Sequence, residues 1–168
     1  LDPERRPCNC GRTGCWETMV GLAAFLRRAT TDDDPVNDPG HPLAERMATL
    51  RSRADAGDEG TITALRAIAS DLVSGLSILI DVLNPRAVVL GGYFAFFGEY
   101  LIGPVTAGLD ARAMDAGSAA LVTISRLGLL SAARGGAHLA LERVFQDPTI
   151  IPARSATDTV HPASGADV

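Results

Sequence analysis

The stretch TITALRAIASDLVSGLSILIDVLNPRAVVLGG, residues 61–92, predicts a long helix, a stop and a strand in immediate succession. Apolar residues recur at alternating steps of three and four, which indicates one apolar stripe along a helix. We expect this helix to be central and buried, because its last turns are apolar on the other faces as well. Asn84-Pro85 ends it, since proline disfavours a helical residue before it. The run Ala87–Gly92 is β-branched and ends in two glycines, which is typical of a buried parallel strand. The stripe consists of Ile62, Leu65, Ala69, Leu72, Leu76, Leu79 and Leu83.

Shorter elements flank this stretch on both sides. The apolar spacing predicts helices over 16–29, 43–54, 96–112 and 133–145 and a second strand over 121–125. Gly103-Pro104 is a potential kink in the third of these helices. This order predicts an α/β fold in which several helices pack on an incomplete sheet. We expect residues 1–146 to form the folded region and the Pro-, Ser- and Asp-rich residues 147–168 to form a flexible tail.

Size and charge exclude several classes of protein. The 168 residues suit one domain with its own core. A net charge of -5 argues against a nucleic-acid-binding surface in this part of the protein. No secretory signal opens the chain, and the apolar run 72–92 is interrupted by polar residues and a proline, so we expect no membrane span. The prediction is a cytoplasmic protein, and the odd number of cysteines agrees, because secreted disulfide frameworks use even numbers.

All three cysteines lie in CNCGRTGCWE, residues 8–17, at Cys8, Cys10 and Cys15. A C-x-C pair is poorly placed to form its own disulfide, whereas a loop freed by two glycines can place several thiolates around one zinc ion. Three reduced structural thiols, or a redox pair with a spare thiol, remain alternatives. A structural zinc site wants four ligands, and only three are local.

The fourth ligand has no obvious source in the sequence. Asp2 and Glu4 are the only carboxylates before the first cysteine. The histidines at 41, 138 and 161 lie in a loop, a predicted helix and the tail, where each is read as an ordinary packed or solvated residue.

Two further features have both a structural and a functional interpretation. Glu17 opens a helix, where the helix dipole favours a carboxylate. Gly91 and Gly92 join a strand to a helix, a geometry that lets backbone amides approach a phosphate but that also serves as a plain tight connection. Tyr93 and Phe94 follow, and their bulk is expected to fill space that a nucleotide would use.

CNCGRTGCWE resembles the C-x-C-G-x-x-G-C-x-E signature of the ROK family, which groups repressors, open reading frames and sugar kinases. DVLNPRAVVLGGYFAFFGEYL (81–101) and LGLLSAARGGAHLALERVF (127–145) resemble later segments of that family. The resemblance covers Cys8 to Phe145, and it implies the C-terminal part of an actin-like, ribonuclease H-like fold that binds sugar between two α/β domains.

The resemblance also implies roles for individual residues. Cys8, Cys10 and Cys15 would bind a structural Zn²⁺, completed by a histidine upstream of this chain. Glu17 would accept hydrogen bonds from the hydroxyls of a sugar or sugar phosphate. Gly91 and Gly92 would lie near a nucleotide, with ATP and Mg²⁺, only in a kinase.

The first hypothesis is the sugar-sensing effector region of a ROK transcriptional regulator, whose DNA-binding domain lies outside this chain and which needs no catalytic residue. The second is a fragment of an ATP-dependent, glucokinase-like sugar kinase. Kinases of the family carry a D-x-G-x-T loop and an Asn-Asp pair upstream of the cysteines, and 55–61 and 37–38 only echo these motifs at the wrong places. The third is a non-catalytic zinc-containing oligomerisation domain. The family commonly forms dimers or tetramers, so a homo-oligomer without membrane contact is expected.

Overall fold

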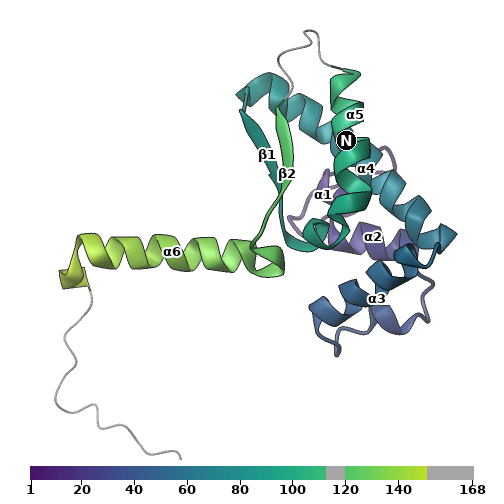
Figure 1. Ribbon diagram of the computed structural model, residues 1–168, viewed down its shortest axis with the longest axis horizontal. Helices are drawn as coiled ribbons and strands as arrows, with labels where there is room; N and C mark the ends of the chain where they lie inside the picture. Colours follow the sequence, from purple (N-terminus) through teal and green to yellow (C-terminus); the bar gives the residue numbers. More distant parts are fainter. Residues whose placement is uncertain (113–119, 151–168) are drawn as a thin grey trace, which may run out of the picture. The chain divides into compact units, whose positions relative to one another are not determined.

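The computed structural model describes residues 1–112 and 120–150 (Figure 1). The chain divides into two compact units, Leu1–Ala132 and Ala133–Val168. Among the described residues, the first unit contains most of the secondary structure and the second contains most of α6. The tail expected from residue 147 lies mostly outside the described residues. The helices are α1 (Glu17–Val20), α2 (Leu22–Ala29), α3 (Leu43–Asp55), α4 (Glu59–Leu83), α5 (Gly98–Asp110) and α6 (Ser131–Gln146), and the strands are β1 (Ala87–Leu90) and β2 (Leu121–Ile124). Short 3-10 turns lie at Pro35–Asn37, Gly92–Phe97, Gly128–Leu130 and Pro148–Ile150.

Helix α4 is the axis of the first unit, and α2 and α5 pack against it. It begins earlier than the periodicity alone predicts, because the Asp58 side chain accepts a hydrogen bond from the Thr61 amide at 2.7 Å and caps the helix. It ends at Leu83 with Asn84 in the left-handed conformation, which confirms the predicted stop before Pro85. The largest fully buried side chains around it include Phe25, Leu65, Ile68, Leu72, Phe97 and Leu101.

Burial of α4 stops before its end. Leu76 is buried, but Leu79 is 42% exposed and Val82 is 74% exposed, so the expectation of a fully buried helix is wrong for its last two turns. The described part of the chain leaves these turns uncovered. By length and composition alone α4 would suffice to cross a membrane, a property that core helices share, and 44% of its most apolar window is buried inside this fold. We therefore assign α4 to the core.

The two strands pair in parallel, with Ala87 opposite Leu121 and Leu90 opposite Ile124. This confirms both predicted strands, and within the described residues the sheet has these two strands only, as the incomplete sheet predicted from the sequence requires. Helix α5 packs against β2, and Leu90 of β1 and Val122 of β2 are buried. Val89 is 61% exposed, so the expectation of a buried strand is confirmed for Leu90 and wrong for Val89. Helix α5 runs through Pro104 without a break, so the potential kink does not divide it.

The helix predicted over 16–29 is interrupted at Gly21, which has extended backbone angles and separates α1 from α2. Only a glycine fits at this break, because a Cβ at position 21 would overlap the Glu17 carboxylate. Periodicity does not reveal such a break, since the apolar spacing continues across it.

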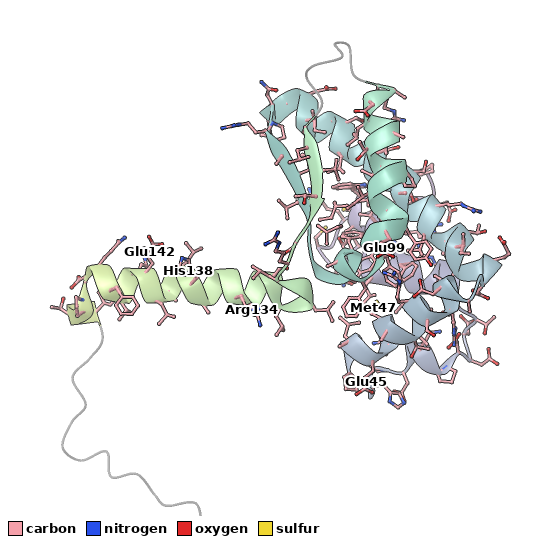
Figure 2. The ribbon with its side chains drawn as sticks, in the orientation of Figure 1. Glu45, Met47, Glu99, Arg134, His138 and Glu142 are labelled. Carbon is pink, nitrogen blue, oxygen red and sulfur yellow. The ribbon has the colours of Figure 1, made fainter. Side chains whose placement is uncertain are left out.

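Helix α3 confirms the helix predicted over 43–54 and shows a clear inward and outward face. Met47 is fully buried, whereas Glu45 on the same helix is exposed (Figure 2).

In the second unit, α6 confirms the predicted closing helix and begins two residues earlier, at Ser131. Its described side chains are mainly exposed, including Phe145 at 80%.

Candidate functional site

The cysteine loop folds back on itself through its backbone. Pro7 and Thr13 form an antiparallel bridge, and the Cys8 amide donates to the Arg12 carbonyl at 2.8 Å. Gly11 and Gly14 have φ of 82° and 72°, angles that side-chain-bearing residues rarely adopt. The glycines of the motif therefore serve to close the loop.

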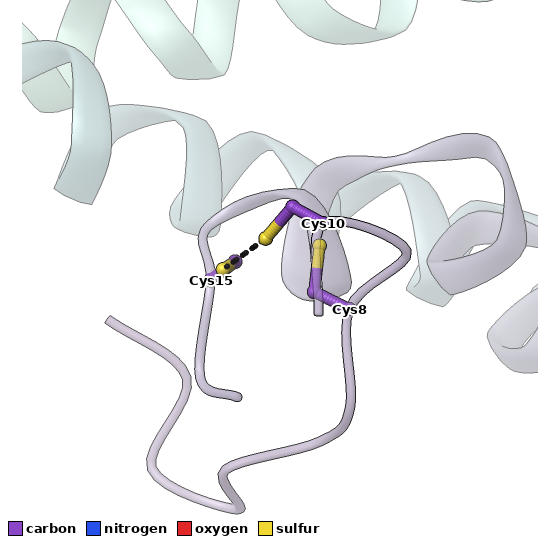
Figure 3. Close-up of side chains that lie close together, drawn as sticks. All are labelled: Cys8, Cys10 and Cys15. Atoms are coloured by element: carbon purple, nitrogen blue, oxygen red, sulfur yellow. Dashed lines mark hydrogen bonds between the residues drawn. The ribbon is translucent and has the colours of Figure 1, made fainter. Parts of the chain in front are cut away.

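Closing the loop gathers the three thiols predicted as metal ligands. The sulfur atoms of Cys8, Cys10 and Cys15 all lie within 4.8 Å of one another, with 3.5 Å between Cys10 Sγ and Cys15 Sγ (Figure 3). All three are free cysteines. Thiolates that share a tetrahedral zinc ion with bonds of about 2.3 Å are about 3.8 Å apart, so the cluster fits a metal of that kind.

Arg12 makes the three thiols chemically unequal. Its Nε donates to Cys10 Sγ at 3.4 Å and lowers the pKa of Cys10 to about 6. The hydrogen bond with Cys10 raises the pKa of Cys15 to about 11. Cys10 is therefore the natural first ligand, because a metal binds thiolates, and further binding must displace a proton from Cys15.

Asp2 braces the loop and is not a free ligand. The residue is buried, and its carboxylate accepts from Thr18 Oγ1 at 2.8 Å, from the Glu4 amide at 3.0 Å and from the Arg6 amide at 3.2 Å. Burial alone would raise the pKa of Asp2, but these hydrogen bonds outweigh it and hold that pKa below its usual value. The other carboxylate, Glu4, pairs with Arg6. Among the described residues, the three cysteines are the one group of side chains close enough together to hold a metal ion. His161 lies outside the described residues.

Glu17 opens α1 directly after the loop and lines a pocket of about 280 Å³. One wall of this pocket is the cysteine loop and another is α2. The structure therefore brings the predicted sugar-binding carboxylate and one of the predicted metal ligands, Cys8, to the same pocket. Its lining residues are Arg6, Pro7, Cys8, Asn9, Glu17, Thr18, Ala23, Ala24 and Arg27.

The indole of Trp16 anchors this region to the core. Its Nε1 donates to the Asp71 carbonyl of α4 at 2.8 Å, and its ring fills the space that Gly75 leaves open. Because Trp16 lies between Cys15 and Glu17 in the sequence, one side chain fixes both the loop and the start of α1 on α4.

The Gly91-Gly92 turn lies apart from this pocket, and neither residue lines it. Gly92 has a φ of 62°, and Tyr93 turns inward from it, where the hydroxyl donates to the Val20 carbonyl at 2.5 Å and the ring stacks on Phe25. Burial, with a smaller contribution from the Glu17 charge, strongly raises the pKa of Tyr93. The Tyr93 ring therefore lies in the core.

Comparison with known proteins gives one consistent result. The sequence model described as ROK family matches residues 1–143. A glucokinase of Halalkalibacterium halodurans is 30% identical over 114 residues, covering 64% of this chain and 34% of the relative. A xylose repressor of Bacillus spizizenii is 29% identical over 83 residues, covering 49% of this chain and 19% of the relative.

A solved structure shows the same fold. The ROK family glucokinase from Streptomyces griseus, determined in complex with glucose and AMPPNP, superposes with a TM-score of 0.64 at 22% identity. The match covers 83% of this chain and 48% of that one. The chain thus spans less than half the length of each of these relatives, and the architecture is that of part of an actin-like fold.

Proposed function

Because the chain belongs to the ROK family, whose matched relatives include sugar kinases and a sugar repressor, we propose that it is the sugar-sensing part of a transcriptional regulator. The observation that carries this proposal is the pocket in which Glu17 meets the cysteine loop. The pocket volume of about 280 Å³ lies just below the range of about 300–1,000 Å³ that is typical of small-molecule sites, so the pocket suits a small ligand such as a monosaccharide.

Glu17 is the group that recognises the sugar in this proposal. Glu17 lines the pocket, and an ionised carboxylate is an acceptor only, so it would pair with hydroxyl donors and discriminate against analogues that lack them. The Gly21 break supports this role, because the absence of a Cβ there leaves room for the carboxylate.

Zinc bound by Cys8, Cys10 and Cys15 is proposed to hold the wall of the pocket in place. The metal would supply thiolate bonds that fix the loop, and Cys8 and its neighbours Pro7 and Asn9 line the pocket directly. A histidine outside the present sequence is the proposed fourth ligand.

Binding without chemistry is enough for a sensor. A sugar that prefers one arrangement of the protein shifts the population towards it, and that shift changes the affinity of a separate DNA-binding domain for its operator. The net charge of -5 agrees with a division of labour in which this region does not itself contact DNA. A cytoplasmic homo-oligomer is part of the proposal.

The test is calorimetry on the complete protein with glucose, xylose and N-acetylglucosamine. Glu17→Gln is expected to abolish binding of the sugar that binds, whereas Glu45→Gln, which neutralises an exposed carboxylate on α3, should leave it unchanged. Unchanged binding in the Glu17 variant would refute the proposed site. Zinc binding without any sugar binding would support the oligomerisation-domain alternative.

An ATP-dependent sugar kinase is the second candidate, favoured by the similarity to glucokinases. In that case the turn at Gly91 and Gly92 is the proposed approach to ATP and Mg²⁺, and the space beside Gly92 is open, since no atom lies within 4 Å of a Cβ built there. Formation of ADP from MgATP, dependent on glucose, decides between the two candidates.

A further inference from the structure

Two of the three thiols in the cysteine loop, those of Cys10 and Cys15, lie in contact with each other. Their Sγ atoms are 3.5 Å apart, and Figure 3 shows Cys8 to one side of the pair. A disulfide bond is about 2.05 Å long, so the two sulfurs need to approach by about 1.5 Å. Rotation of the two side chains about χ1 covers a distance of this size. Cys10 and Cys15 are therefore placed to form a disulfide without refolding of the loop.

Cys8 is held out of this pair by its backbone. Its amide donates to the Arg12 carbonyl at 2.8 Å, and its carbonyl accepts from the Gly11 amide at 2.9 Å. Only one residue separates it from Cys10, a spacing that is poor for a disulfide. Exposure also distinguishes the thiols, because Cys10 is exposed whereas Cys8 and Cys15 are half-buried. A small reagent from solvent therefore reaches Cys10 first.

We propose that the cysteine loop is a redox switch, in which a peroxide converts Cys10 and Cys15 to a disulfide and the metal is released. Both sulfurs are thiolates when they bind a metal. The Cys10 thiolate attacks one oxygen of the peroxide, the O–O bond breaks, and Cys10 becomes a sulfenic acid. The Cys15 thiolate then attacks the Cys10 sulfur, the S–S bond forms, and the sulfenic oxygen leaves as hydroxide. The two sulfurs lose two electrons to the peroxide, and with two protons from solvent the hydrogen peroxide becomes two water molecules.

The disulfide removes two of the three local metal ligands, since the metal binds thiolates. Cys8 alone is left in the loop, and it lines the Glu17 pocket. The other end of the loop also reaches this pocket, because the amide and hydroxyl of Thr18, a lining residue, donate to the Cys15 carbonyl at 3.1 and 2.7 Å. Oxidation is therefore expected to loosen the pocket wall and weaken sugar binding. This last step rests on the proposed function, whereas the disulfide and the metal release do not.

The test treats the complete protein, reduced and loaded with zinc, with hydrogen peroxide. The free thiols of the loop should fall from three to one, and zinc equal in amount to the protein should appear in a colorimetric assay. Dithiothreitol should restore all three thiols, because a disulfide is reversible and a sulfinic acid is not. Proteolysis of the oxidised protein after Arg12 separates Cys10 from Cys15, so the proposed bond links two peptides, whereas a bond between Cys8 and Cys10 stays within one.

Cys8→Ser is the matched control, because it removes a thiol from the same loop but leaves the proposed pair intact. It should still form the cross-link between the two peptides, whereas Cys10→Ser and Cys15→Ser should form none. The proposal is overturned if Cys8 is part of the disulfide, if all three thiols survive the peroxide, or if the disulfide forms and the zinc stays bound. Reduced protein that holds no zinc would also overturn the proposed release.

Calorimetry with the sugar that binds separates this switch from the proposed function. Oxidised protein should bind that sugar at least about tenfold more weakly than reduced protein, and dithiothreitol should restore the affinity. An unchanged affinity in oxidised, zinc-free protein would overturn control of the pocket while sugar binding at Glu17 stands. If no sugar binds even to the reduced protein, the proposed function fails, and the thiol and zinc measurements still decide the redox step.

Discussion

The contact between Trp16 and Gly75 predicts that one added methyl group will loosen the functional region from the core. Gly75 is buried within α4, and a Cβ at this position would overlap the Trp16 indole. In an exposed helix, Gly→Ala stabilises by about 1 kcal/mol. Here the overlap costs about 1–3 kcal/mol, and displacing the ring also breaks the 2.8 Å hydrogen bond to the Asp71 carbonyl, worth about 1 kcal/mol. The net expectation for Gly75→Ala is a loss of stability of about 1–3 kcal/mol.

The chain offers a matched control in Gly60, an exposed glycine in the first turn of α4 whose Cβ would meet only the Asp58 side chain, at an ordinary contact distance of 3.5 Å. Gly60→Ala should stabilise by about 0.5–1 kcal/mol. Denaturant unfolding followed by the fluorescence of Trp16, the single tryptophan, measures both variants. The reasoning is refuted if Gly75→Ala is as stable as the parent protein, because the indole would then have room that the structure does not show.

Three further predictions concern the site and its supports. A four-ligand zinc site contributes about 10–16 kcal/mol, so Cys10→Ser should weaken zinc binding at least about a hundredfold in a chelator competition, and an unchanged affinity would exclude Cys10 as a ligand. Tyr93→Phe keeps the ring packing but leaves the Val20 carbonyl without its donor, so denaturant unfolding should show a loss of about 1–2 kcal/mol, and a neutral result would mean that water replaces the hydroxyl. The Arg53 guanidinium lowers the pKa of Asp34, so this pair stabilises the fold above the ordinary carboxyl pKa of about 3.9 and the contribution is lost as the pH falls through the lowered pKa. Asp34→Asn should therefore be less stable than the parent at pH 7 and nearly equal to it at pH 2, and a constant difference across that range would argue against the ion pair.

The spacing of apolar residues predicted the helices, because a helix with one buried face needs an apolar residue every three or four positions. The stripe from Ile62 to Leu83 identified α4, and Asn84-Pro85 marked its end. The same pattern could not show that Leu79 and Leu83 are exposed, because an apolar stripe records that something covers a face and not which part of the chain does so. The break at Gly21 was also hidden, since the apolar spacing continues across it and the contact between Gly21 and the Glu17 carboxylate appears only in the folded structure.

The sequence likewise predicted some residues of the candidate site and not others. The three cysteines could be found from their spacing, because two glycines with positive φ close so short a loop. Asp2 could not, since its role depends on donors from Thr18 and from the folded backbone around it. Long-range partners of this kind leave no local pattern in the sequence.

Arg27 and Arg28 show most directly why the function of a charged residue depends on its place on a helix. Consecutive helical residues point about 100° apart, so two identical side chains on α2 face different surroundings. Arg28 is directed to Asp71 and also donates to the Met19 carbonyl at 3.1 Å, which ties α1 and α2 to the core helix. Arg27 is directed to the pocket of Glu17, where main-chain carbonyls orient it without neutralising it. Exchanging the roles would require turning α2 about its axis, which burial of Phe25 and Ala24 prevents. The core thus decides which of the two arginines pairs with Asp71 of α4.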